Sequence, residues 1–249
     1  MKLRTALLAA ILALAGTGHA LAQTIYKVGS TPTGQPFTFL DIKTNKIQGM
    51  MVDLITEIGA DAGFQVDVQP TQFAVLIPSL TGGRIDIMSA AVTITPQRAE
   101  LIDFTQPIFP YHEGLIVQKA DNTPYKSIAD LAGQVVGVQG GTTYEAMLRR
   151  EGKFAEIRTY DAIADIMRDV QLGRIKAGFA DDPIVRYRLG QDKNATVKVV
   201  NTYEPRVVGD VALGVKKGNK ELLDKLNAGI AKLKASGRVQ ALQEKWGLR

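Results

Sequence analysis

Short β-rich runs alternate with segments of helical periodicity along this chain, and this alternation restricts the fold more than any other feature. Residues 26–30 and 64–68 are strand-like, and between them the apolar residues of 50–62 recur on one helical face that stops at Gly63. Residues 85–91 form a nearly continuous apolar run, which suits a strand buried on both faces. This order predicts an α/β fold with mainly parallel sheets.

A second unit of the same kind begins after Gly114. We predict strands at residues 115–118, 135–139 and 177–180, and a helix that starts at Thr142-Thr143 after Gly140-Gly141. A last strand at residues 211–215 precedes two amphipathic helices over residues 220–235 and 238–246. No low-complexity linker separates the units, so we expect two lobes joined by strands that act as a hinge.

The first 22 residues are typical of an export signal. Lys2 and Arg4 form a short positive region, an apolar run over residues 6–15 follows, and Ala20-Leu21-Ala22 is a small-x-small cleavage site. The apolar run is too short to span a bilayer, which takes about 20 residues. We therefore expect cleavage near Ala22 and a mature protein in a bacterial periplasm.

Composition excludes several classes of function. The chain has no cysteine and two histidines, and His19 belongs to the leader, so thiol chemistry, Cys-ligated zinc and a histidine metal cluster are excluded. His112 remains, but no G-x-S-x-G elbow accompanies it. The net charge of +5 is spread without a basic tract, which disfavours nucleic acid as a partner. We expect no cofactor, no metal and no catalytic residue.

Arg98 breaks a local rule. Thr95-Pro96 is a favourable helix start, and an arginine in the first turn meets the positive end of the helix dipole. The conflict disappears if a carboxylate binds the N–H and hydroxyl groups around Ala91 and Thr93, because Arg98 is then its counter-ion. The alternative is a surface arginine paired with a neighbouring acid, Glu100 or Asp103.

Asp181 is a second unexplained charge. It follows the apolar strand at residues 177–180, whereas Asp182 is expected to cap a helix with Pro183 at its first position. Because ligands of α/β sheets bind beyond the carboxyl ends of strands, Asp181 is well placed for an ammonium group. The alternative is a turn aspartate that bonds its own backbone. Phe73 is either a core residue or an apolar wall for a ligand.

Order and spacing of several motifs carry a resemblance. The motifs are PFTFLD near residue 36, GMMVDL at 49–54, LIPSLTGGRIDI, TITPQR, DFTQP, VGVQGGTT, ADDP at 180–183 and the final KW. Together they resemble the periplasmic solute-binding proteins that deliver polar amino acids to ABC importers (bacterial extracellular solute-binding protein family 3). The resemblance covers residues 26–246.

The resemblance implies a two-lobed periplasmic binding protein fold, each lobe a mainly parallel sheet flanked by helices, joined by two hinge strands. Lobe 1 would comprise residues 23–110 and 211–249, and lobe 2 residues 111–210. It also implies a ligand site in which Arg98 grips the α-carboxylate with help from the Thr93 hydroxyl and the Ala91 N–H. From lobe 2, the Thr143 N–H would contribute and Asp181 would receive the α-ammonium. Phe73 would stack on the ligand.

Some positions depart from the family pattern. Thr31 stands where some members carry an acid that contacts the ligand's side chain, and Gly34 replaces an aromatic platform. Thr31 remains a candidate ligand contact. Residues 106–114 are about two residues longer than usual before their glycine, which would bring Tyr111 or His112 nearer the cleft.

The expected function is that of a non-enzymatic, monomeric binding protein that captures a polar amino acid or a derivative by hinge closure and presents it to an ABC transporter permease. The alternative is an enzyme on the same scaffold that resembles cyclohexadienyl (prephenate or arogenate) dehydratases. A receptor ectodomain is disfavoured because no second apolar segment of membrane-spanning length follows the leader.

Overall fold

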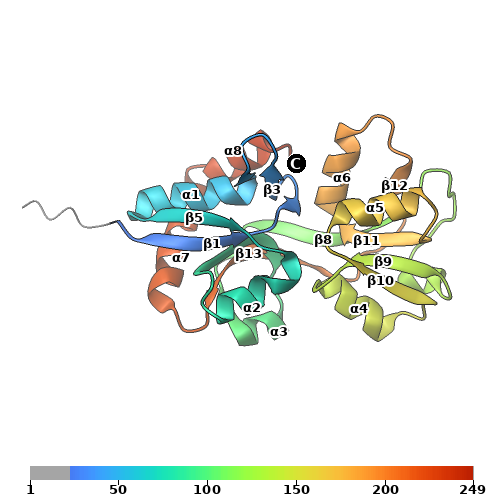
Figure 1. Ribbon diagram of the computed structural model, residues 1–249, viewed down its shortest axis with the longest axis horizontal. Helices are drawn as coiled ribbons and strands as arrows, with labels where there is room; N and C mark the ends of the chain where they lie inside the picture. Colours follow the sequence, from blue (N-terminus) through green and yellow to red (C-terminus); the bar gives the residue numbers. More distant parts are fainter. Residues whose placement is uncertain (1–22, 249) are drawn as a thin grey trace, which may run out of the picture.

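The computed structural model describes residues 23–248, so the predicted leader lies outside the described residues. Two lobes lie side by side (Figure 1). One sheet path runs through both lobes in the order β10 (Glu156–Tyr160), β9 (Val135–Gln139), β11 (Ala177–Asp181), β8 (Phe109–Gln118), β13 (Val208–Lys216), β6 (Ile87–Thr93), β1 (Ile25–Ser30) and β5 (Gln65–Pro70). In lobe 1, β1 pairs parallel with β5 and β6, and in lobe 2, β9 pairs parallel with β10 and β11. β8 and β13 run antiparallel to each other and to their other neighbours in this order. The predicted α/β class and two-lobed fold are confirmed.

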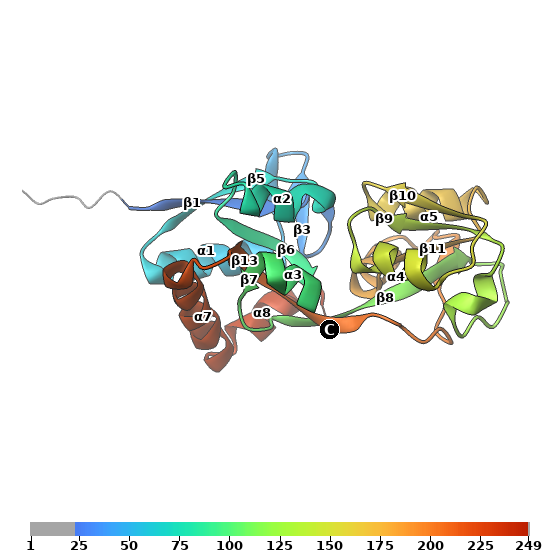
Figure 2. The ribbon, with the colours of Figure 1, turned by 90° about the horizontal axis from the view of Figure 1, so that it is seen from below.

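Lobe 1 places a sheet between two groups of helices, on one side α1 with α7 and α8 and on the other α2 with α3 (Figures 1 and 2). Its elements are β1 (Ile25–Ser30), α1 (Met50–Ala62), β5 (Gln65–Pro70), η1 (Phe73–Val75), α2 (Leu76–Thr81), β6 (Ile87–Thr93), α3 (Pro96–Leu101), β7 (Ile102–Phe104), β13 (Val208–Lys216), α7 (Lys220–Ala235) and α8 (Arg238–Lys245). A separate three-stranded meander, β2 (Thr33–Gly34), β3 (Thr38–Asp41) and β4 (Lys46–Gln48), precedes α1.

Lobe 2 repeats the pattern with fewer elements. They are β8 (Phe109–Gln118), η2 (Ile128–Leu131), β9 (Val135–Gln139), α4 (Thr143–Glu151), β10 (Glu156–Tyr160), α5 (Ile163–Gln171), β11 (Ala177–Asp181), α6 (Asp182–Gln191) and β12 (Val197–Val199). α4 lies on one side of the sheet, and α5 and α6 lie on the other (Figure 1).

β8 and β13 form the connection between the lobes (Figure 2). They pair antiparallel over four residues each, from Phe109 opposite Val211 to His112 opposite Val208. The predicted lobe boundaries, 110/111 and 210/211, fall inside this paired segment. Both connections between the lobes run through this short paired segment, which is where a hinge between them would lie.

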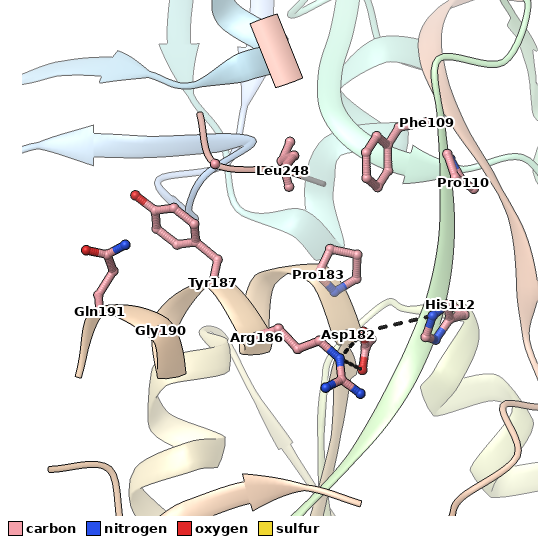
Figure 3. A pocket seen from close by; sticks show the side chains of 11 residues that line it. Phe109, Pro110, His112, Asp182, Pro183, Arg186, Tyr187, Gly190, Gln191 and Leu248 are labelled. Carbon is pink, nitrogen blue, oxygen red and sulfur yellow. Dashed lines mark hydrogen bonds and ion pairs between the residues drawn. The ribbon is translucent and has the colours of Figure 1, made fainter. Parts of the chain in front are cut away.

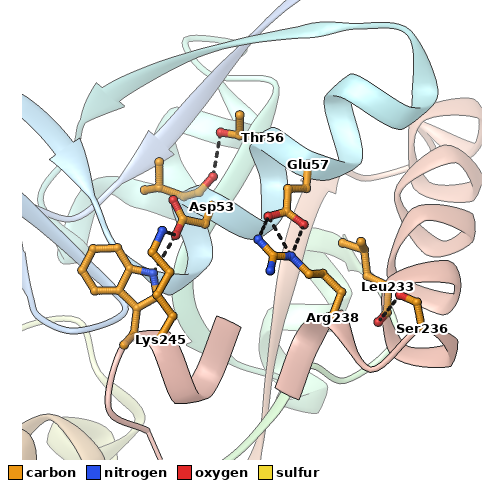
Figure 4. A network of polar contacts seen from close by, with 9 residues as sticks. Asp53, Thr56, Glu57, Leu233, Ser236, Arg238 and Lys245 are labelled. Carbon is orange, nitrogen blue, oxygen red and sulfur yellow. Dashed lines mark hydrogen bonds and ion pairs between the residues drawn. The ribbon is translucent and has the colours of Figure 1, made fainter. Parts of the chain in front are cut away.

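Two acidic residues on α1, Asp53 and Glu57, contact α8 and the residue that follows it (Figure 4). Glu57 accepts a bidentate contact from Arg238, with 2.6 Å for the shortest N–O distance, and Asp53 accepts from Lys245 and from the Trp246 indole at 2.7 Å each. Exposed ion pairs contribute little free energy, about 0–1 kcal/mol each. Their spacing of four residues along one helix face sets where α8 sits on lobe 1.

Candidate functional site

A narrow cavity lies between the lobes, where the strands of both sheets end. Its lining comes from both lobes and is mostly apolar or uncharged polar: Thr31, Thr33, Gly34, Phe37, Thr38, Phe73, Ala90, Ala91, Tyr111, Gln139, Ile163, Asp181 and Ile184. The cavity volume is about 10 Å³, which is room for about one water molecule. The lobes are therefore closed in this structure, and a ligand enters only after they separate.

The end of β6 is distorted toward this cavity. Met88 pairs with Gly214 and Val92 with Ala212, so the three residues between them on β6 oppose a single residue of β13. Within this bulge Ala91 has φ = 51°, a left-handed conformation that costs a non-glycine residue roughly 1–2 kcal/mol. Ser30 and Ser89 brace the bulge, because their hydroxyls donate to the carbonyls of Ser89 and Met51 at 2.7 and 3.0 Å.

Arg98 is only 9% exposed, although it sits in a short helix near the surface. Thr95 caps α3 as predicted, accepting from the Arg98 backbone N–H at 3.2 Å. The guanidinium donates to the carbonyl of Thr93 at 2.9 Å and, across the cleft, to the carbonyl of Gly141 at 3.2 Å. It lies 5.7 Å from the centre of the Phe73 ring, within cation–π range.

The alternative for Arg98, a surface ion pair, is wrong. Asp103 pairs with Lys217 at 2.8 Å, and no carboxylate in residues 23–248 forms an ion pair with Arg98. Burial lowers the pKa of the guanidinium, and the fields of Tyr144 and Asp181 oppose that shift. Only two of its five N–H donors are used by these carbonyls, which leaves donors for an anion.

Asp181 faces the cavity from lobe 2. It occupies the position before the first residue of α6, but its carboxylate does not cap that helix. Instead it accepts from the Tyr144 hydroxyl at 2.8 Å. Burial raises the pKa of Asp181 to about 6, against the Tyr144 hydrogen bond and the charge of Arg98, which both lower it. A carboxylate that is costly to ionise gains strongly from a cationic partner.

The prediction that Asp182 caps α6 is wrong. Asp182 is the first residue of the helix, and its carboxylate pairs with Arg186, one turn further on, at 2.8 Å. Proline is tolerated anywhere in the first turn, where the backbone N–H groups lack helical partners, so Pro183 did not determine which aspartate precedes the helix.

The other predicted contacts divide into two groups. Thr31, Ala91 and Phe73 line the cavity with Asp181, and the Thr31 hydroxyl shares a 2.7 Å hydrogen bond with that of Thr38. The remaining contacts lie near the cavity without lining it: Arg98 lines an adjoining cavity that also contains Phe73, Thr93 supplies the carbonyl under Arg98, and Thr143 is the half-buried first residue of α4.

Tyr111 and His112 point to opposite sides of β8, as successive strand residues do. Tyr111 lines the cavity, is 2% exposed, and packs edge-on against Phe37 with ring centres 5.3 Å apart. His112 faces an outer groove along the other side of α6, where its ring nitrogen is 3.9 Å from Asp182 (Figure 3). Phe109, Tyr187 and Leu248 supply apolar walls of this groove.

Further contacts join the lobes in the closed form. Arg188 of α6 donates to the Thr33 carbonyl of lobe 1 at 3.0 Å, and Gln35 donates to the Tyr187 hydroxyl at 3.4 Å. A Cβ on Gly141 would lie 2.8 Å from Cα of Ala74, so the two backbones touch here. With Arg98, these contacts bridge the cleft from both lobes.

Sequence reasoning missed Tyr144, Gln139 and Arg188. Tyr144 and Arg188 lie inside helices, where a tyrosine or an arginine is ordinary, and nothing local marks either as facing another lobe. Gln139 ends β9, and its position at a strand's carboxyl end was the one usable signal.

Two negative findings apply to residues 23–248. These residues contain no group of three or more His, Cys, Asp or Glu side chains placed to hold a metal ion. None of their helices combines the length and the apolar character that crossing a bilayer requires.

Comparison with known proteins gives a consistent result. The sequence profile of the bacterial extracellular solute-binding proteins, family 3, matches residues 26–249. The chain is 33% identical to the L-cystine-binding protein TcyJ of Escherichia coli (strain K12) over 88% of its own length and 81% of that protein. It is 30% identical to ABC transporter arginine-binding protein 1 of the same strain, over 96% and 97% of the two chains.

A solved structure agrees with these relatives. An ancestral arginine-binding protein bound to glutamine superposes with a TM-score of 0.82 at 32% identity, over 90% of this chain and 98% of that one. These relatives are named as binding proteins and not as enzymes, which supports the binding function over the dehydratase alternative. Sequence, fold and relatives agree, and the chain belongs to the bacterial extracellular solute-binding proteins of family 3.

Proposed function

We propose that this protein is the periplasmic ligand-binding component of an ABC importer, and that it captures an amino acid between its two lobes. The observation that carries the proposal is the placement of a buried cation and a half-buried anion at the same cleft, Arg98 on lobe 1 and Asp181 on lobe 2. No direct ion pair joins them, although each affects the pKa of the other. A small zwitterion complements both.

The proposed roles follow from this geometry. The α-carboxylate binds the Arg98 guanidinium next to the bulge at Ala91 and the neighbouring Thr93, and takes the place of the Gly141 carbonyl as an acceptor. The α-ammonium binds Asp181, which Tyr144 holds in place. Thr143 lies at the start of α4, where free N–H groups favour an anion. Phe73, which already contacts Arg98, is the apolar wall.

Ligand binding stabilises the closed form only through contacts that need both lobes. Arg98 and Asp181 satisfy this condition because they come from different lobes. The ligands named for three relatives are cystine, arginine and glutamine. These ligands share the α-amino and α-carboxylate groups and differ in the side chain, which supports a site built around the shared groups.

The remaining parts of the proposal concern location and partners. We propose export by the N-terminal 22 residues with cleavage near Ala22, and action as a monomer that delivers its ligand to a membrane permease. Relatives whose names place them in ABC transporters support the permease as a partner.

The test is a panel of amino acids in thermal-shift and calorimetric assays on the mature protein. At least one amino acid is expected to raise the melting temperature, because it binds only the folded state. Arg98→Ala is expected to make the binding free energy of that amino acid about 2–5 kcal/mol less favourable, because it leaves the ligand's carboxylate unpaired. A folded variant that loses less than threefold in affinity refutes the role of Arg98. Incubation with prephenate or arogenate is expected to yield no aromatic product.

A further inference from the structure

The charges at the cavity are few enough to restrict the ligand. Asp181 is the one charged side chain among the described residues that line the cavity, and Arg98 lies in the adjoining space. If the α-ammonium takes the carboxylate and the α-carboxylate takes the guanidinium, no counter-ion is left among the described residues that line these two cavities. A charged side chain on the ligand would then be buried without a partner, which is costly.

Tyr111 supplies a polar group that has no assigned use. Its side chain is 2% exposed, and its hydroxyl has no hydrogen-bond partner in the described part of the chain. Burial raises the pKa of Tyr111 well above its usual value, so the hydroxyl is neutral. A buried hydroxyl left unpaired is destabilising, and a polar atom of a ligand in this cavity would satisfy it.

A second uncharged donor lies on the lobe 1 wall. The hydroxyls of Thr31 and Thr38 share one hydrogen bond, which uses one of their two protons. The other proton is available to an acceptor in the cavity. Both walls therefore present hydroxyl groups to the ligand's side chain, and neither presents a second charge.

We propose that the cavity selects an amino acid whose side chain is uncharged and hydrogen-bonding, such as an amide or an alcohol, and that Tyr111 is its specificity-determining contact. This inference rests on the proposed function, because it assumes that Arg98 and Asp181 bind the α-groups. It excludes basic and acidic amino acids as the preferred ligand, and also cystine, whose far end carries a second ammonium and carboxylate.

The experiment is isothermal titration calorimetry of the mature chain with glutamine, asparagine, serine, threonine, arginine, lysine, glutamate, cystine and the apolar norvaline. The tightest uncharged polar ligand is expected to bind at least 100-fold more tightly than each charged one. Tyr111→Phe is expected to lower the affinity for that ligand at least tenfold and the affinity for norvaline less than twofold. Tyr26→Phe, which removes a hydroxyl from the β1 strand of lobe 1 outside the cavity, is the matched control and is expected to change neither.

A gain of function gives an independent readout. Thr31→Asp places a carboxylate in the cavity wall, and is expected to improve arginine relative to the best neutral ligand at least tenfold. If arginine, lysine, glutamate or cystine binds the wild-type protein most tightly, the inference is overturned and the proposed function stands. Equal effects of Tyr111→Phe on polar and apolar ligands overturn the role of Tyr111. Binding of no amino acid overturns both the inference and the proposed function.

Discussion

Asp181→Asn is expected to stabilise the unliganded protein while it weakens ligand binding. Asparagine has nearly the same shape, and its amide oxygen still accepts from the Tyr144 hydroxyl. What it removes is the cost of ionising a buried acid. That cost is visible in the pKa of Asp181, which burial raises from 3.8 to about 6.

The magnitude follows from this shift. One unit of pKa corresponds to about 1.36 kcal/mol, so an ionised Asp181 lowers the stability of the unliganded protein by up to about 3 kcal/mol at neutral pH. For a chain of this size, each kcal/mol moves the melting temperature by roughly 2–4 °C. The variant is therefore expected to melt up to about 12 °C higher at pH 7.5.

The pH dependence separates this effect from a change in packing. Because the pKa of Asp181 is higher in the folded state, the folded protein binds more protons between about pH 4 and pH 6, and the wild type loses stability as the pH rises through that window. The variant lacks this loss. The difference in melting temperature is expected to be small near pH 4 and full at pH 7.5, and a difference that is equal at both pH values, or reversed at pH 7.5, refutes the reasoning.

Three other predictions concern pH, closure and the hinge. The wild-type affinity for an amino acid is expected to fall by up to tenfold per pH unit below about pH 6, as Asp181 becomes protonated, and calorimetry that shows equal affinity at pH 5 and pH 7.5 contradicts this. Gly141→Ala places a Cβ 2.8 Å from Cα of Ala74, at a residue whose φ of 76° disfavours any side chain, so the closed form is strained. We expect at least a tenfold loss of affinity and a larger radius of gyration of the liganded protein. An unchanged affinity would show that closure does not bring these backbones together. Glu113→Gln replaces a fully buried acceptor of the Arg206 and Val207 N–H groups with a side chain that has only one acceptor oxygen. The free energy of unfolding in urea is expected to fall by about 1–3 kcal/mol, and that of the exposed control Glu221→Gln to change by less than about 0.5 kcal/mol. Equal effects of the two substitutions would rule out a special role for the buried acid.

Elements with strong local signals were predictable from the sequence. The helices at Met50–Ala62 and Lys220–Ala235 have the predicted bounds, because an apolar stripe runs along each and Gly63 ends the first in a left-handed conformation. β9 (Val135–Gln139) also has its predicted bounds, since its buried run ends at a glycine pair. The meander at residues 33–48 was missed because its strands have only two to four residues, too few to show a period.

The candidate site was predictable where charge conflicted with local structure. A helix start does not need the charge of Arg98 and a strand end does not need that of Asp181; at the interlobe cleft the first is buried and the second half-buried. Tyr144 and Arg188 satisfy the helices that contain them, so their contacts with Asp181 and with the Thr33 carbonyl follow only from how distant segments pack. Local pattern carries no information about such contacts.

At Thr33 a single residue has two separable tasks. Its main-chain oxygen receives Arg188 from the opposite lobe, and its side chain forms part of the wall that a ligand meets. Every residue type has a main-chain carbonyl. A substitution at position 33 can therefore change which ligand fits the cavity and still keep the hydrogen bond from Arg188 that joins the closed lobes. A new cargo can thus evolve at this position without rebuilding the clamp.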